Sequence, residues 1–250
     1  MHNLTSESSK WSPSPESLSF QTDEVHVWRF ELEQPEHLVE EFRTTLEEDE
    51  VHRANRFHFE KHRRAFLVGR GFLRYVLGHY LETKPEALRF SYSTYGKPAL
   101  NGEHKSSPLR FNMSHSHGLG LFAVTENNEL GVDVEHVRAD FASEDIARRF
   151  FSPGEVEAFN ALPKEERVAA FFRCWTRKEA FIKATGRGLS QPLDGFDVTL
   201  GPGEPARLLR ADEDVASRWS LSDLDAGVDY AAALAVAGPV LKIQCWQFSA

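Results

Sequence analysis

The 250-residue sequence contains only two cysteines, Cys174 and Cys245, and has no long apolar run. Two thiols form one disulfide at most, which excludes a disulfide-stapled scaffold. One disulfide stays open, but we favour buried thiols in a reducing compartment. The longest apolar stretch, residues 230–238, is far shorter than the ~20 residues that span a bilayer. Residues 1–20 lack the apolar core of a signal peptide. We therefore expect a soluble, cytoplasmic protein.

The sequence also has no excess of positive charge. Its 29 lysines and arginines stand against 38 acidic residues, which gives a formal net charge of -9. Such a balance argues against a general nucleic-acid or membrane surface. Any polyanionic ligand must therefore meet a local basic cluster within an acidic protein.

Three common catalytic or nucleotide-binding motifs are missing. There is no phosphate-binding loop of the Gly-x4-Gly-Lys-Ser/Thr kind, no Gly-x-Ser-x-Gly elbow, and the short "GRGF" does not complete a dinucleotide fingerprint. The familiar nucleotide folds and serine hydrolases are therefore poorly supported.

The chain contains alternating strand and helix patterns. Strand-like runs begin at residues 24, 88, 109, 118 and 130, and helical patterns cover residues 35–81, 143–162 and 171–185. Four more strand-like runs follow, beginning near residues 195, 218, 230 and 241. This order predicts an α+β fold of two similar halves, each an antiparallel sheet with packed helices. We expect a flexible tail over 1–21, an N-terminal half over 22–118 and a C-terminal half over 119–250.

The segment "FFRCWTRKEAFIKATGRG", residues 171–188, predicts a helix that ends near Gly186. Glu179 and Lys183 lie one turn apart on the edge that also carries Trp175. Such a pair is either a surface ion pair or two working parts of a site.

The run "GVDVE" places two carboxylates on one face of a predicted strand. Asp133 and Glu135 are two residues apart, so both side chains point the same way while Val132 and Val134 face the core. Two neighbouring carboxylates suit a hard cation such as Mg²⁺ or Mn²⁺. The alternative is a solvent-facing strand edge.

The run "FNMSHSHG" places His115 and His117 on one face, with Ser114 and Ser116 on the other. Two histidines suit zinc, but no third ligand is evident. Ordinary exposed or hydrogen-bonded histidines are favoured. A third alternative is one histidine that donates to a phosphate oxygen.

Two basic features are candidates for phosphate binding. Lys97 precedes Pro98 in the turn "YGKPAL", and Lys61, Arg63, Arg64 and Arg70 cluster in "EKHRRAFLVGRG". Guanidinium groups bind phosphate in a bidentate manner, although such runs are usually solvated helix faces.

Four of these motifs occur in an order that resembles the Sfp-type 4'-phosphopantetheinyl transferases. They are "GKP", "FNMSHS", "GVDVE" and "WTRKEAFIKATGRGL", within a resemblance that spans residues 57–189. The resemblance implies two similar α+β halves with coenzyme A bound in the cleft between them. It also implies transfer of the phosphopantetheine arm of coenzyme A to a serine of an apo carrier protein, with release of 3',5'-ADP.

The same resemblance implies roles for individual residues. The Mg²⁺ ligands, with Mn²⁺ as an alternative metal, are expected to be Asp133, Glu135 and Glu179. Catalysis is assigned to Glu179 as the base, directly or through a water, with Lys183 and His115 neutralising phosphate charge. The expected coenzyme A site consists of Arg63, Arg64, Arg70, Lys97, Pro98, Ser114, His115, Asp133 and Lys183.

The partners follow from the same resemblance. We expect an apo acyl or peptidyl carrier protein as acceptor, docking on residues 136–151, and a monomeric enzyme without nucleic-acid or membrane contacts. Two rival functions share these motifs. One is a metal-dependent diphosphate hydrolase or nucleotidyl transferase, and the other is a non-catalytic module that binds coenzyme A or the carrier.

Overall fold

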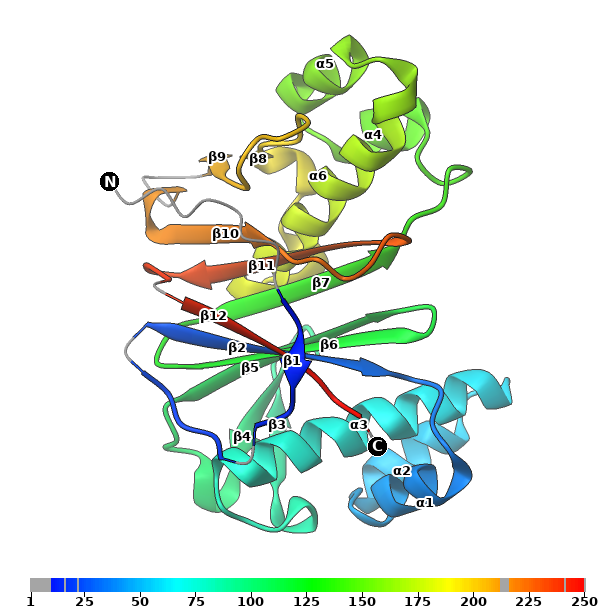
Figure 1. Cartoon of the computed structure of the whole chain (residues 1–250), viewed down its shortest axis with the longest axis vertical. Helices are drawn as coiled ribbons and strands as arrows, with labels where there is room; N and C mark the ends of the chain where they lie inside the picture. Colours follow the sequence, from blue (N-terminus) through cyan, green and yellow to red (C-terminus); the bar gives the residue numbers. More distant parts are fainter. Residues whose placement is uncertain (1–9, 16, 22, 212–215, 241, 250) are drawn as a thin grey trace.

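A computed structural model of the chain describes residues 10–15, 17–21, 23–211, 216–240 and 242–249. Two groups of helices enclose two central sheets (Figure 1). The α-helices in these ranges are α1 (Glu36–Thr44), α2 (Glu48–Asn55), α3 (Glu60–Tyr80), α4 (Glu144–Phe150), α5 (Pro153–Ala161) and α6 (Lys164–Thr185). The expected helix over residues 171–185 is therefore confirmed, and it begins earlier than the sequence pattern indicated.

The first sheet has five strands in the order β1-β12-β2-β6-β5. Its strands are β1 (Ser12–Pro13), β2 (Glu24–Glu31), β5 (Leu109–Ser116), β6 (Leu119–Glu126) and β12 (Lys242–Gln247). The antiparallel β2-β6-β5 core is extended by β12, which runs parallel to β2 and to β1. The end of the chain thus pairs with the sheet that the start of the chain builds.

The second sheet has three antiparallel strands in the order β10-β11-β7. They are β7 (Leu130–His136), β10 (Trp219–Asp223) and β11 (Tyr230–Ala237). Two small hairpins complete the strands: β3 (Arg89–Tyr92) with β4 (Pro98–Asn101), and β8 (Asp197–Val198) with β9 (Leu208–Arg210).

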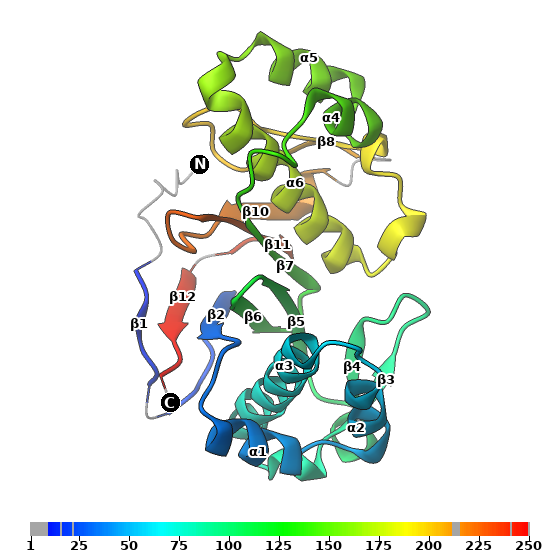
Figure 2. The same ribbon diagram turned by 90° about the vertical axis from the view of Figure 1, so that its right-hand side faces the viewer.

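The two sheets pack on each other and each is covered by helices on its outer face (Figures 1 and 2). Side chains of a strand alternate between the faces. On β2, Val25 and Val27 therefore join the cluster between the sheets, whereas Trp28 and Phe30 join the cluster under α3. Strand β6, which is buried on both faces from Leu119 to Thr125, is accordingly an almost continuous apolar run.

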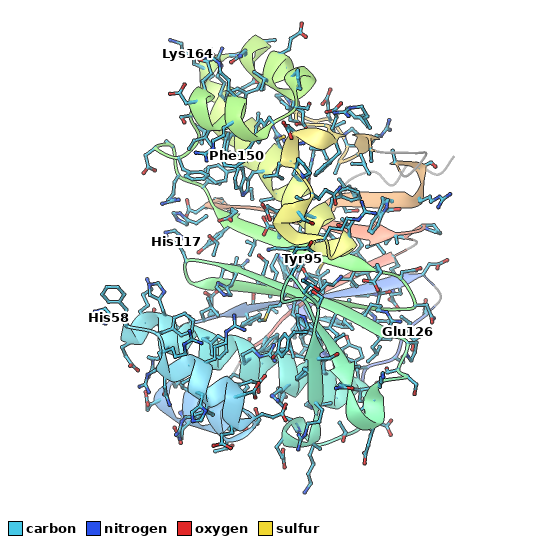
Figure 3. The ribbon with its side chains drawn as sticks, turned by 180° about the vertical axis from the view of Figure 1, so that it is seen from behind. His58, Tyr95, His117, Glu126, Phe150 and Lys164 are labelled. Carbon is cyan, nitrogen blue, oxygen red and sulfur yellow. The ribbon has the colours of Figure 1, made fainter. Side chains whose placement is uncertain are left out.

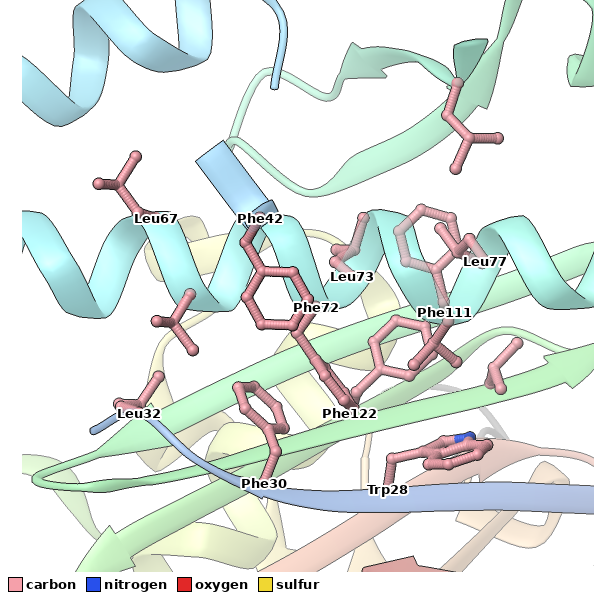
Figure 4. Packing of buried hydrophobic residues seen from close by; sticks show 14 of the residues in the cluster. Trp28, Phe30, Leu32, Phe42, Leu67, Phe72, Leu73, Leu77, Phe111 and Phe122 are labelled. Atoms are coloured by element: carbon pink, nitrogen blue, oxygen red, sulfur yellow. The ribbon is translucent and has the colours of Figure 1, made fainter. Parts of the chain in front are cut away.

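Helix α3 covers the first sheet through an aromatic core (Figure 4). The rings of Phe30 and Phe72 stack with centroids 3.9 Å apart, and Phe72 meets Phe122 edge-on at 6.5 Å. Phe72 and Phe122 are fully buried. Such pairs fix the height of the helix above the sheet.

Helix α6 lies close against β7 because Gly131 has no side chain. A Cβ at Gly131 would lie only 2.2 Å from the carbonyl oxygen of Ala180. The close approach brings the last two turns of α6 to the start of β7, beside the strand residues that carry the predicted carboxylates. The expected α+β fold, with helices packed on antiparallel sheets, is confirmed.

The expected division of the chain between residues 118 and 119 stays a prediction. Strands β6 and β12 follow this point in the sequence, yet they belong to the first sheet together with strands that precede it. Residues 1–9 of the expected tail lie outside the described residues. Within the rest of the tail, β1 pairs with β12, and the Trp11 side chain donates to the carbonyl oxygen of Asp225 at 2.5 Å.

Candidate active site

Strand β7 places two carboxylates on the face that meets α6. Val132 and Val134 point into the core between the sheets. Asp133 therefore faces the other way and is 2% exposed, and Glu135, two residues on, shares that face and is half-buried. The sequence prediction of two inward valines and two outward carboxylates is borne out in this geometry.

Helix α6 brings Lys183 to the same place. Its ammonium donates to Asp133 Oδ1 at 2.6 Å and to the Ser114 hydroxyl at 2.8 Å. The sequence suggested a pair between Glu179 and Lys183, whereas the lysine instead pairs with a carboxylate of the strand. The other carboxylate oxygen, Asp133 Oδ2, is buried without a hydrogen-bond partner among the described residues.

Glu135 and Glu179 lie in an environment that disfavours their negative charge. Burial raises the pKa of Glu135, Asp133 adds to the rise, and the Ser116 hydroxyl opposes it. Burial also raises the pKa of Glu179, as do the charges of Asp133 and Glu135, while Lys183 opposes the rise. The three carboxylates therefore act on one another electrostatically across the β7–α6 contact.

This carboxylate cluster fits a hard cation. No three acidic, histidine or cysteine side chains of the described residues stand in a ready-made metal geometry. One Asp133 oxygen is nevertheless unpartnered within the described residues, and burial together with the charge of Asp133 raises the pKa of Glu135 and Glu179, so a bound cation would stabilise this cluster. Oxygen-only ligands with few protein carboxylates are the set that Mg²⁺ and Mn²⁺ take.

The two histidines of the "FNMSHSHG" run do not share a face as expected. Strand β5 ends at Ser116, and His117 lies in the following turn with a φ of 53°. Its ring stacks on that of His136, with centroids 4.2 Å apart (His117 is labelled in Figure 3). His115 stays on the strand, where partial desolvation and then the charge of Lys183 lower its pKa. The structure thus gives no support to a zinc pair.

The three candidate arginines differ in their surroundings. Arg63 is 39% exposed and pairs with Glu60 on its own helix. Arg64 pairs with Glu36 and donates to the carbonyl oxygen of Gln34 at 3.1 Å. Both guanidinium groups lie at the surface, where a ligand can exchange with the carboxylate partner.

Arg70, by contrast, is held in a structural network. Its side chain is 8% exposed and its Nε donates to Glu50 Oε1 at 2.8 Å. It also donates to the Tyr92 hydroxyl at 2.7 Å. A phosphate would have to displace a buried carboxylate, so this placement argues against the expectation that Arg70 binds coenzyme A.

Lys97 is also engaged by the protein. Its ammonium donates to Glu129 Oε2 at 3.0 Å and to the carbonyl oxygens of Leu130 and Ala184, each at 3.1 Å. These contacts tie the β3–β4 hairpin to the start of β7 and the end of α6. Lys97 therefore has three protein partners, and Pro98, next to it, begins β4.

Comparisons with known proteins agree with this geometry. Residues 28–127 match the family model described as 4'-phosphopantetheinyl transferase, N-terminal, and residues 129–235 match the 4'-phosphopantetheinyl transferase superfamily model. The 4'-phosphopantetheinyl transferase HetI of Nostoc is 43% identical over 95% of this chain and 98% of its own length. The chain belongs to the 4'-phosphopantetheinyl transferase family.

More distant relatives carry the same activity in their names. A putative 4'-phosphopantetheinyl transferase of Synechocystis is 34% identical over 67% of each chain. The transferase Sfp of Bacillus subtilis is 32% identical over 64% of this chain and 69% of its own. The resemblance that four short motifs indicated is thus confirmed.

One structural role was missed from the sequence, in which Ser114 was expected only to bind coenzyme A and Asn112 and Ser116 were given no role. Asn112, Ser114 and Ser116 form hydrogen bonds from β5 to β7, although the strands belong to different sheets. The signal was present in "FNMSHS", where a short polar side chain recurs at every second position. The sequence alone did not show which strand these side chains would face.

Proposed function

We propose that this 4'-phosphopantetheinyl transferase uses coenzyme A as donor and requires a divalent cation, Mg²⁺ or Mn²⁺. The reaction attaches the phosphopantetheine arm to a serine of an apo carrier protein and releases 3',5'-ADP. The observation that carries the proposal is the convergence of Asp133, Glu135, Glu179 and Lys183 where α6 meets β7. Family membership supplies the reaction class, and this cluster supplies the chemistry that it needs.

The cation ligands in this proposal are Asp133, Glu135 and Glu179. When bound, the cation would neutralise the diphosphate of coenzyme A and the charge that develops in the transition state. Such a cation would relieve the repulsion among these side chains, since Asp133 raises the pKa of Glu135 and of Glu179, and Glu135 adds to the rise at Glu179.

Glu179 is proposed as the general base for the serine hydroxyl. Its carboxylate would accept the hydroxyl proton directly or through a water. The serine oxygen attacks the phosphorus that bears the pantetheine arm, and 3',5'-ADP leaves with the electron pair of the broken bond. Lys183 and His115 offset the negative charge on the phosphate oxygens.

The coenzyme A site is proposed to follow the cleft beside these residues. Arg63 and Arg64 are the favoured partners of the 3'-phosphate, because both lie at the surface of α3. The Ser114 hydroxyl accepts a hydrogen bond from Lys183, and the charge of Lys183 also acts on His115. Lys97 and Pro98 would contribute through the backbone of their hairpin, since the Lys97 ammonium is already bonded.

The carrier protein is proposed to dock on residues 136–151. Two arginines of this segment lie over phenylalanine rings, Arg138 over Phe141 and Arg149 over Phe150, each at 5.3 Å. Arg148 is 60% exposed. Guanidinium groups beside aromatic surface suit an acidic partner with an apolar contact patch.

A monomeric, cytoplasmic enzyme is proposed as well. Cys174 and Cys245 are both buried, as expected for thiols of a reducing compartment. Among the described residues, no helix is long and apolar enough to cross a membrane. The length of the match to HetI supports a chain that provides both halves of the cleft.

Release of 3',5'-ADP from coenzyme A tests the proposal against its rivals. The purified chain is incubated with coenzyme A and Mg²⁺, with and without an apo carrier protein. We expect release only with the carrier and only in the presence of the cation. Release without a carrier would favour a diphosphate hydrolase. Coenzyme A binding without any release would favour a non-catalytic binding module.

A further inference from the structure

A ladder of side chains joins the two sheets at β5 and β7. The backbone N–H groups of Val132, Val134 and His136 each donate to a side-chain oxygen of β5. The acceptors are Asn112 Oδ1 at 2.9 Å, Ser114 Oγ at 3.4 Å and Ser116 Oγ at 3.1 Å. Every second residue of one strand thus bonds every second residue of the other, in place of a backbone ladder.

The direction of the hydrogen bonds at Ser116 follows from the donors available. The N–H of His136 can only donate, so Ser116 Oγ must accept from it. The single hydroxyl hydrogen of Ser116 is then free to donate elsewhere, and Glu135 Oε2 lies 2.8 Å away. Because that carboxylate is ionised when it binds a cation, this hydroxyl presents it with a charge-assisted hydrogen bond.

The hydrogen bonds at Ser114 and Asn112 can be compared with those at Ser116. Ser114 bonds the Asp133 carboxylate at 2.9 Å in the same way, but it also accepts from Lys183. Asn112 accepts from the N–H of Val132 and is buried, at 6% exposed, and no bond from it to a carboxylate is seen in the described residues. Loss of the Asn112 side chain therefore affects only the ladder, whereas loss of the Ser116 hydroxyl affects both the ladder and a hydrogen bond to a carboxylate.

We propose that Ser116 is a positioning residue that holds the Glu135 carboxylate toward Asp133 for the divalent cation. The inference rests on the proposed cation requirement. Glu135 is half-buried beside Asp133, and the charge of Arg138 reaches it from the loop after β7. Without the Ser116 hydroxyl, repulsion from Asp133 and attraction to Arg138 both favour a Glu135 rotamer that turns away from the site. Hydrogen bonds to ligating carboxylates commonly change metal affinity by about 10–100-fold.

Manganese binding by calorimetry on the metal-free full chain tests this role without any turnover. Ser116→Ala is expected to weaken Mn²⁺ binding roughly tenfold, while the dissociation constant for coenzyme A alone stays unchanged. Ser116→Thr keeps the hydroxyl on a side chain suited to a strand and is expected to restore Mn²⁺ affinity. In turnover, Ser116→Ala should raise the Mg²⁺ concentration for half-maximal rate without raising the KM for coenzyme A.

Asn112→Ala is the matched control because it breaks the ladder without removing a bond to a carboxylate. It should lower the midpoint of urea unfolding but leave Mn²⁺ affinity unchanged. Unchanged Mn²⁺ affinity in Ser116→Ala, or equal losses in both variants, would overturn the proposal. Wild-type protein that binds no Mn²⁺ would overturn it as well. Wild-type protein that binds Mn²⁺ but transfers nothing would refute the transferase mechanism alone.

Discussion

The two halves of the molecule anchor their long helices by the same device. In each half, a short helix has a glutamate at its third position that closes a capping box: Glu50 in α2 and Glu155 in α5. Each glutamate then reaches a buried cation of the following long helix. Glu50 binds Arg74 of α3 with Oε2 at 2.8 Å, and Glu155 Oε2 lies 2.7 Å from the ammonium of Lys178 in α6.

The long helices differ in what their exposed edges carry. The buried arginines of α3 form structural contacts, and Arg63 and Arg64 lie at the surface at the start of the helix. Helix α6 has the same buried anchor and adds Glu179 and Lys183, which face β7. The two helices thus differ in their tasks: both contain the anchor, and α6 adds two of the proposed reacting groups.

The largest expected effect is on turnover, from a change in α6. Glu179→Gln keeps the shape of the side chain and removes the proposed base. We expect turnover to fall by about 10²–10⁴-fold, with little change in coenzyme A affinity measured by calorimetry. Equal losses of turnover and coenzyme A binding would instead indicate a purely ligand-holding or structural role.

The next largest effect is a loss of stability, which should appear in both halves. Lys178→Met leaves the Glu155 carboxylate buried without its cation, and Arg74→Met removes one of two cations from Glu50. Breaking a buried pair on one side costs about 3–5 kcal/mol. Urea unfolding of both variants measures this cost. We expect the larger loss for Lys178→Met, because Arg70 still pairs with Glu50. No loss in Lys178→Met would contradict the anchor.

A smaller effect is expected from replacing Lys183, the lysine at the proposed site. Lys183→Ala removes the partner of Asp133 and the proposed ligand of the diphosphate. We expect coenzyme A affinity and turnover to fall together, by roughly tenfold each, as for the loss of one charge-assisted contact. Arg43→Ala, at an exposed pair with Glu40 on α1, serves as the control and should leave both values unchanged. Unchanged kinetics in Lys183→Ala would remove this lysine from the site.

The smallest effect is on how the free energy of unfolding of the metal-free protein depends on pH. Glu135 and Glu179 have raised pKa values, so the folded chain holds their protons to higher pH than the unfolded chain does. Their contribution to the free energy of unfolding is therefore present at low pH and is lost as pH rises above the ordinary carboxyl range. Urea unfolding across this range should show a decline that Mg²⁺ reduces. An equal decline in a Glu135→Gln, Glu179→Gln double variant would refute this origin.

Much of the fold followed from periodicity in the sequence. Strands β2, β6 and β7 and helix α3 carry strong apolar patterns, and their positions were predicted closely. The start of α6 was missed because residues 164–170 are mostly charged or small and show little apolar periodicity. Pairing of β1 with β12 joins opposite ends of the chain, which no local pattern can indicate.

The positions of the acidic side chains could be predicted from the sequence better than the contacts of the basic side chains. Asp133, Glu135 and Glu179 lie in motifs whose spacing already fixes their direction. Arg70 and Lys97 were both expected to bind ligand, yet their partners are remote in sequence: Glu50 for the arginine, and Leu130 and Ala184 for the lysine. Whether a basic side chain is held in structural contacts or left to bind a ligand depends on neighbours that are remote in sequence.

The intact mass of an apo carrier protein tests the central claim most directly. The carrier is incubated with this chain, coenzyme A and Mg²⁺, beside a carrier whose acceptor serine is replaced by alanine. The account predicts a gain of one phosphopantetheinyl group on the native carrier and none on the alanine variant, and a greatly slowed gain with Glu179→Gln. No gain on several kinds of carrier, despite measurable coenzyme A binding, would contradict it.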